Sequence, residues 1–131
     1  MATDVRALMD NIRSCCDFQN KAVVHVGVGA GSLVAWSAAA RSVLAVDRDA
    51  DAVRRLGETL REQGLLGRVI VFRGDFAAVR ARADVVFLTF CLHAMPDPDA
   101  ALRHARTLAP ETVVVDPAPG SRWAWYRGEE A

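Results

Sequence analysis

The sequence of 131 residues has no excess of charge of either sign, because 16 Lys and Arg residues balance 16 Asp and Glu residues. It also lacks a basic run, the usual electrostatic signature of a nucleic-acid-binding protein. No apolar run reaches the roughly 18–20 residues that a membrane-spanning helix needs. These absences argue against nucleic acid and membranes as partners, and they leave room for a small-molecule site.

Cysteine is scarce as well, with three residues, of which Cys15 and Cys16 are adjacent. This spacing gives neither a redox Cys-x-x-Cys motif nor half of a zinc site, so we predict no metal. The first residues carry charges at positions 4, 6, 10 and 13 and therefore lack the apolar centre of a signal peptide. We expect a cytoplasmic protein with reduced thiols that pack as small apolar side chains.

Extended and helical patterns alternate along the chain, without a linker or an internal repeat. Short apolar runs predict five strands, at residues 21–26, 42–46, 69–72, 83–89 and 112–115. Periodicity and capping residues predict helices at residues 4–16, 32–40, 49–63 and 97–108, with a short helical piece near 76–82. The prediction is a single α/β domain over residues 1–131: a doubly wound, mostly parallel sheet of about five strands with helices on both faces. Its parts are an N-terminal helix in 1–18, the core in 19–116 and an aromatic tail in 117–131.

Residues suited to ligand binding follow the predicted strands, at the carboxyl edge where such sheets bind ligands. The first strand runs into GVGAG, where Gly27, Gly29 and Gly31 let the backbone turn tightly and approach a ligand closely. The helix that follows offers free N–H groups at its N-terminus. Asp47 follows the second strand, 20 residues after Gly27. A carboxylate there can accept hydrogen bonds from both hydroxyls of a ribose.

Asp75 follows the third strand and could accept from an adenine amino group, with Phe76 against the ring. Plainer interpretations exist: a tight glycine turn, a solvated Asp47, and an Asx turn or helix cap at Asp75. The dinucleotide fingerprint needs a third glycine where this chain has Ser32. An NAD enzyme would also need a catalytic domain, for which the chain has no room.

In this order, the strand-end segments resemble the motifs of class I S-adenosylmethionine (AdoMet)-dependent methyltransferases, over roughly residues 20–120. VVHVGVGAGS resembles the first motif, VLAVDRD the second, RGDF the third, and residues 85–120 the stretch from the fourth strand to the fifth. The resemblance implies AdoMet as cofactor and the following binding positions: Gly27, Val28, Gly29 and Gly31 for the methionine part, Asp47 and Arg48 for the ribose, Asp75 and Phe76 for the adenine, and the backbone near Thr89 and Phe90 for the ammonium. The helix at 4–16 resembles the family's lid over the cofactor.

The chain departs from this family in two ways. His25 stands where the family usually has an acid that helps to hold the loop and the cofactor's ammonium. A neutral histidine could accept a hydrogen bond there, a protonated one would repel the cofactor, and a core histidine bonded to backbone fits equally well. The family's sheet also ends in two further strands, so we expect a bare edge at 112–115 and a homodimer or partner that covers it.

Two segments are candidates for substrate chemistry. His93 lies where the resemblance places the rim of the active site, and an imidazole with a pKa near 6.5 suits a general base. A surface or helix-capping role for His93 is the alternative. Trp123, Trp125 and Tyr126 form either an apolar wall for the acceptor or a cover for the bare sheet edge.

The predicted function is methyl transfer from AdoMet to a small-molecule acceptor. The alternative is a catalytically weak or inactive methyltransferase-like module that serves binding or assembly. A nucleotide-binding subunit that uses NAD or a mononucleotide is a third, minor interpretation.

Overall fold

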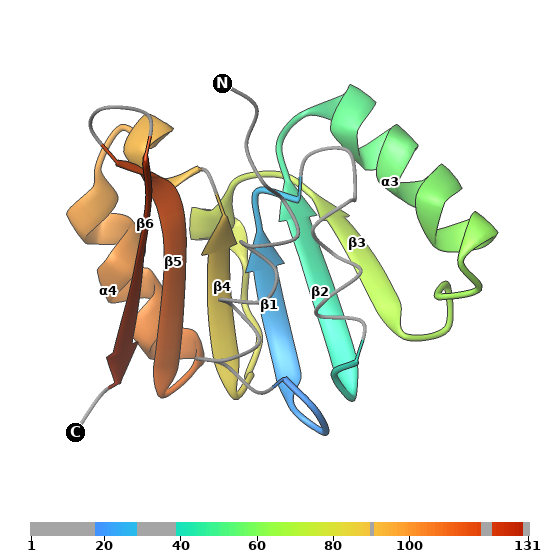
Figure 1. Cartoon of the computed structure of the whole chain (residues 1–131), viewed down its shortest axis with the longest axis horizontal. Helices are drawn as coiled ribbons and strands as arrows, with labels where there is room; N and C mark the ends of the chain where they lie inside the picture. The colour runs from blue at the N-terminus through green and yellow to red at the C-terminus, as the bar shows by residue number, and fades with distance from the viewer. Residues whose placement is uncertain (1–17, 29–38, 90, 119–121, 130–131) are drawn as a thin grey trace.

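A computed structural model of the chain describes residues 18–28, 39–89, 91–118 and 122–129 (Figure 1). The helix expected at 4–16 lies outside these residues, and so do residues 32–38 of the helix expected at 32–40. Residues 39 and 40 are described and form a turn, so that helix does not extend to 40. The described strands form one sheet in the order β3-β2-β1-β4-β5-β6. Their bounds are β1 Ala22–Val26, β2 Ser42–Asp47, β3 Val69–Arg73, β4 Val85–Thr89, β5 Glu111–Ala118 and β6 Arg122–Glu129.

The five strands expected from the apolar runs are all present and parallel to one another. The chain builds β1, β2 and β3 toward one edge of the sheet and then crosses to place β4 on the other side of β1. This reversal makes the β1–β4 boundary the topological switch point, beside which ligands bind in doubly wound sheets. Figure 1 shows the tips of β1, β2 and β4 at the same edge.

Two helices cover opposite faces of the sheet. Helix α3, Ala50–Glu62, packs Leu56 and Leu60 on the face that holds Val23 and Phe87. Helix α4, Pro98–Leu108, packs Ala105 and Leu108 on the other face, with Val24 and Val86. Burial of apolar side chains on both faces explains why these strands are continuous apolar runs in the sequence.

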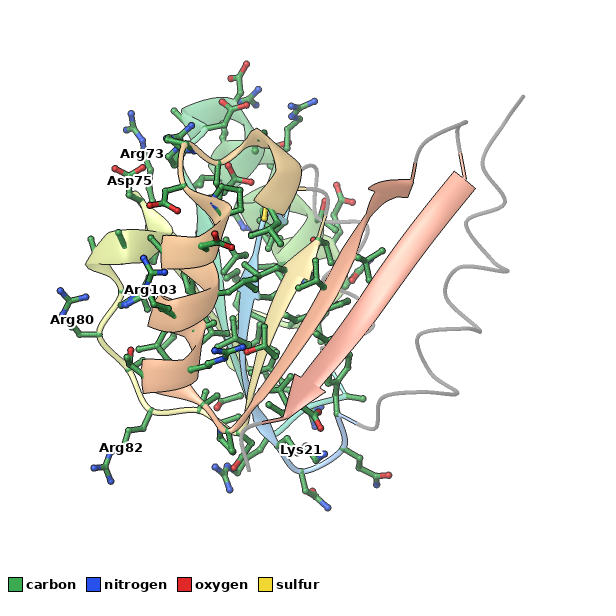
Figure 2. The ribbon with its side chains drawn as sticks, turned by 90° about the vertical axis from the view of Figure 1, so that its left-hand side faces the viewer. Lys21, Arg73, Asp75, Arg80, Arg82 and Arg103 are labelled. Atoms are coloured by element: carbon green, nitrogen blue, oxygen red, sulfur yellow. The ribbon has the colours of Figure 1, made fainter. Side chains whose placement is uncertain are left out.

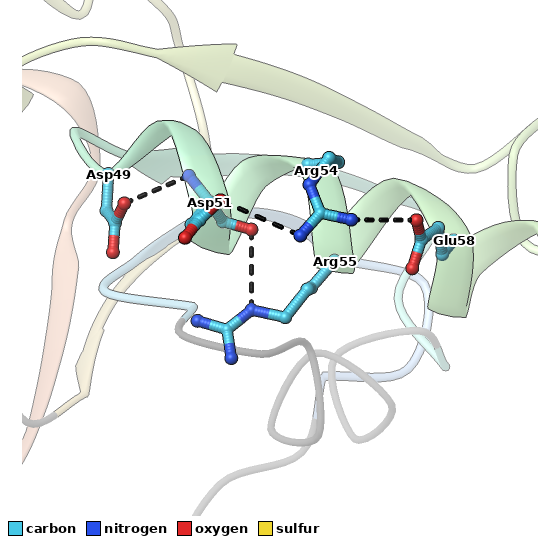
Figure 3. Close-up of polar contacts among 5 residues, drawn as sticks. All are labelled: Asp49, Asp51, Arg54, Arg55 and Glu58. Carbon is cyan, nitrogen blue, oxygen red and sulfur yellow. Dashed lines mark hydrogen bonds and ion pairs between the residues drawn. The ribbon is translucent and has the colours of Figure 1, made fainter.

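Both helices begin at the residues that the sequence indicates. The carboxylate of Asp49 accepts from the N–H of Asp51 at the start of α3, and that of Asp97 accepts from Ala100 at the start of α4. Along α3, Arg54 pairs with Asp51 and Glu58, as Figure 3 shows. These contacts lie on the solvent side of α3, where such pairs add little to stability.

The sheet has one strand more than the sequence analysis expected. Strand β6 pairs antiparallel with β5, and Trp125 lies opposite Val115 in the register. The β5 edge is therefore covered by residues 122–129 of the same chain. Strand β5 extends beyond the expected 112–115 and includes Pro117, which lies opposite Trp123. The aromatic residues that follow have the high strand propensity that favours β6.

Candidate functional site at the carboxyl edge of the sheet

The structure brings most of the predicted site residues that it describes to one edge of the sheet. Gly27 follows β1, Asp47 ends β2, and Thr89 ends β4. Asp75 follows β3, and Figure 2 shows it at the same end of the molecule as Arg73, with Lys21 at the opposite end. The order of the sheet thus places these residues at the ends of four adjacent strands, which include the two that flank the switch point.

Gly27 occupies a position that no other residue fits. Its φ is +81°, in the left-handed region that L side chains rarely adopt. A Cβ atom there would collide with the carbonyl oxygen of Thr89 and would lie 2.9 Å from the Cβ and Sγ atoms of Cys91. The N–H of Gly27 donates to the carbonyl of Val46, at 3.0 Å. The tips of β2 and β4 thus confine the start of the glycine turn from both sides.

His25 is wholly buried in the centre of the sheet. Its ring lies against that of Phe87, with the centroids 4.7 Å apart, and its Nε2 atom is 3.0 Å from Oγ1 of Thr89. Burial lowers the pKa of His25 from 6.5 to about 3, because the apolar surroundings disfavour the charged ring. The ring is therefore neutral at neutral pH and does not repel a cationic ligand. The sequence had left open whether this histidine is neutral or protonated.

Asp47 joins the tips of β2 and β3. One carboxylate oxygen accepts from the N–H of Asp49 at 3.0 Å, and the main-chain carbonyl accepts from Gly74 at 3.0 Å. The side chain is half-buried. This turn fixes the direction of the carboxylate at the point where β2 leaves the sheet.

Arg48 and Asp75 contact each other across the same edge. The guanidinium Nη1 of Arg48 lies 3.3 Å from a carboxylate oxygen of Asp75, and both side chains are exposed. Asp75 stands at the N-cap position of η1, Phe76–Ala78, but makes no capping hydrogen bond there. Phe76 is buried and packs edge-on against His104, with the ring centroids 4.9 Å apart. Phe76 thus holds the segment that carries Asp75 against α4.

Several predicted positions lie outside what the structure describes: Gly29, Gly31, Phe90, and the side chains of His93, Trp123, Trp125 and Tyr126. The backbone around His93 forms η2, Leu92–Ala94, directly beyond the tip of β4. The three aromatic residues belong to β6, at the edge of the sheet beyond β5.

Cys91 lies beside the start of the glycine-rich segment. The sequence analysis predicted only a packing role for the thiols. Its Sγ atom lies 3.6 Å from the carbonyl of Val26 and borders Gly27. The position two residues beyond Thr89 was the only signal available for this contact.

Among the described residues there is no group of three or more His, Cys, Asp or Glu that could hold a metal ion. No helix in the described ranges is long and apolar enough to cross a membrane.

Comparisons with solved structures find the same fold. A SAM-dependent methyltransferase from Aquifex aeolicus is 20% identical, with a TM-score of 0.74 over 87% of this chain and 66% of that one. A putative RNA methyltransferase from Pyrococcus horikoshii is 26% identical, with a TM-score of 0.71 over 87% and 57%. Magnesium protoporphyrin IX methyltransferase from Synechocystis PCC 6803, solved with bound SAH, is 19% identical, with a TM-score of 0.71 over 85% and 53%.

This chain covers between about half and two thirds of the length of these three structures. A comparison with curated proteins gave no match. The family described as "Methyltransferase domain" matches residues 23–111, which is most of the chain and includes the tips of β1 to β4. The chain therefore belongs to the methyltransferase domain family.

Proposed function

We propose that the chain binds AdoMet at the carboxyl edge of its sheet and transfers the methyl group to a small-molecule acceptor. The main support for this proposal is that Gly27, Asp47 and Thr89 lie at the ends of neighbouring strands, beside the switch point. Because Gly27 has no side chain, the backbone of β4 approaches it closely. The carboxylate of Asp47, on the neighbouring strand, is held in place by the N–H of Asp49. A glycine turn next to a carboxylate suits the methionine and ribose parts of one ligand.

The residues at this edge fit AdoMet as follows. The segment with Gly27, Val28, Gly29 and Gly31 holds the methionine part. Val28 contributes only its backbone, because its side chain is buried in the core. Asp47 accepts from the ribose hydroxyls, the Arg48–Asp75 pair borders the adenosine, and the backbone at Thr89 and Phe90 accepts from the ammonium. The sequence analysis expected Phe76 to lie against the adenine, but its ring is buried and packs against His104. We therefore propose that Phe76 holds the segment that carries Asp75. When bound, AdoMet supplies a methyl group activated by its sulfonium, and the protein positions the acceptor in line with it.

The binding test is a calorimetric titration of the purified chain with AdoMet, S-adenosylhomocysteine and NAD. We expect micromolar or tighter binding of the two adenosyl ligands and none of NAD. Tight binding of NAD alone would contradict the proposed ligand.

Transfer of a radiolabelled methyl group to the small-molecule fraction of a cell extract, and not to its RNA, would support the small-molecule acceptor. The reverse pattern would contradict it.

We propose His93 as the general base, for an acceptor that must lose a proton. It follows the tip of β4, next to the switch point. The variant His93→Ala should lower kcat while the Kd for AdoMet stays within about twofold, since a base acts on the acceptor and not on the cofactor. Steady-state kinetics and calorimetry on the same preparation measure both values. Unchanged kcat, or equal losses in kcat and affinity, would exclude the role.

The role of the aromatic residues of β6 and the formation of a homodimer stay predictions. Pairing of β6 with β5 supports the covering role of Trp123, Trp125 and Tyr126. A place for them in the wall of the acceptor site would require the acceptor to extend from the β4 tip across β5. Because β6 covers β5, a homodimer would have to use another surface than the edge first considered. A cytoplasmic location likewise rests on the sequence pattern alone.

A further inference from the structure

A short chain of buried polar groups connects the middle of the sheet to the glycine turn. His25 Nε2 lies 3.0 Å from Thr89 Oγ1, and that hydroxyl lies 2.9 Å from the carbonyl oxygen of Gly27. It also lies 3.3 Å from the carbonyl oxygen of Val26. His25 is 0% exposed and Thr89 is 1% exposed, so the contact between these two side chains is shielded from water. Buried hydrogen bonds of this kind are costly to break.

The chemistry of the groups fixes the direction of the chain. A carbonyl oxygen only accepts, so the single hydroxyl hydrogen of Thr89 is donated to Gly27 or Val26. The hydroxyl oxygen must then accept from His25, which requires the tautomer with a proton on Nε2. Of the two carbonyl oxygens, that of Gly27 is the nearer, at 2.9 Å against 3.3 Å for Val26, so we assign the hydroxyl hydrogen to Gly27. The order of donation is then from His25 Nε2–H to Thr89 Oγ1, and from Thr89 O–H to the carbonyl of Gly27.

The same glycine is held on its other side. Its N–H donates to the carbonyl of Val46 on β2, and the thiol of Cys91 approaches the carbonyl of Val26 at 3.6 Å. Gly27 is thus tied to β2 through its N–H and to β4 through its carbonyl, while its φ is +81°. A glycine is the residue least able to hold such a conformation by itself, because it lacks a side chain that restricts the backbone.

We propose that His25 and Thr89 are positioning residues that orient the Gly27 carbonyl, at the start of the glycine-rich segment, for the cofactor. The inference rests on the proposed function for its binding readout. In this arrangement His25 acts through an uncharged hydrogen bond to Thr89. It is wholly buried and offers no negative charge to the cofactor's ammonium. The ammonium must then be bound by backbone carbonyls at the edge of the site.

The test compares Thr89→Val, which removes the hydroxyl, with Thr89→Ser, which keeps it. The titrated ligand is AdoMet. We expect binding to weaken on the order of tenfold in Thr89→Val and to stay within about threefold of the parent in Thr89→Ser. Thr112→Val is the matched control, because Thr112 is also buried in the sheet but lies on β5 opposite Val86, away from the glycine turn. It should bind as the parent does.

Nitrogen NMR of the imidazole ring provides a readout that needs no cofactor. The parent chain should show His25 as a neutral ring with its proton on Nε2. The Gly27 carbonyl resonance should shift in Thr89→Val but not in Thr89→Ser or Thr112→Val. A proton on Nδ1 only, or a Gly27 resonance indifferent to the hydroxyl, would overturn the inference.

The outcomes separate the two proposals. If the parent chain does not bind AdoMet, the proposed function fails and the NMR measurements alone decide the positioning role. If the parent binds AdoMet and Thr89→Val binds it equally well, the positioning role fails and the proposed function stands. If Thr89→Val does not fold, the ring tautomer of the parent chain decides.

Discussion

Replacing Gly27 by alanine is expected to remove measurable AdoMet binding and to lower the free energy of unfolding by about 2–4 kcal/mol. Part of this loss is backbone strain, because an alanine at a φ of +81° is disfavoured. The rest is collision, since the new Cβ would meet the carbonyl oxygen of Thr89. That oxygen belongs to the backbone of a buried central strand, so it cannot move aside as a flexible side chain would. Urea unfolding and calorimetric titration measure the two effects.

Two other glycines separate the causes. Gly64 has a φ of +69° but open space where the methyl group of an alanine would lie, so Gly64→Ala should show strain without collision. We expect it to lose about 1–2 kcal/mol and to bind AdoMet normally. Gly57 lies within α3, also with open space, and Gly57→Ala should be neutral or stabilising. Normal binding by Gly27→Ala would contradict the proposed place of the glycine turn.

The variant Asp47→Ala is expected to weaken AdoMet binding by about 100-fold or more, because an ionised acceptor of two hydroxyl hydrogen bonds is lost. The free energy of unfolding should fall by only about 1 kcal/mol, for the hydrogen bond from the N–H of Asp49. Calorimetry and urea unfolding of the same preparation distinguish the two effects. A large loss of affinity with a small loss of stability is the pattern that a ligand-binding carboxylate produces.

Asp49→Ala is the matched control for this prediction. Asp49 also carries a carboxylate and lies two residues beyond the end of β2, but its oxygen caps α3 by accepting from the N–H of Asp51. Its loss should lower stability by about 1 kcal/mol and leave AdoMet affinity within about threefold. Equal losses of affinity in Asp47→Ala and Asp49→Ala would mean that Asp47 acts through the turn and not on the ligand.

Much of the fold was predictable because its signals are local. Apolar runs mark the five parallel strands, and Asp49 and Asp97 mark the starts of α3 and α4. The alternation of strands and helices then orders the sheet and brings Gly27, Asp47 and Asp75 to one edge. This part of the site follows from the topology of the sheet, and the sequence pattern is sufficient to predict that topology.

The remainder depends on contacts between distant residues, which no local pattern carries. The bonds of His25 and Thr89 span 64 positions, and the pairing of Arg48 with Asp75 spans 27. The sequence left open whether His25 faces a ligand or the core, and only the packing against Phe87 decides it. Strand β6 was missed for a similar reason, since an edge strand depends on its partner for its backbone hydrogen bonds.

A crystal structure of the chain with S-adenosylhomocysteine tests most directly whether the strand tips bind one adenosyl ligand. We expect the ligand to lie across the ends of β1, β2 and β4, with its ribose hydroxyls hydrogen-bonded to the carboxylate of Asp47 and its amino-acid part against the turn that begins at Gly27. A ligand bound elsewhere on the molecule, with Asp47 and Gly27 free of contact, would contradict the proposed site.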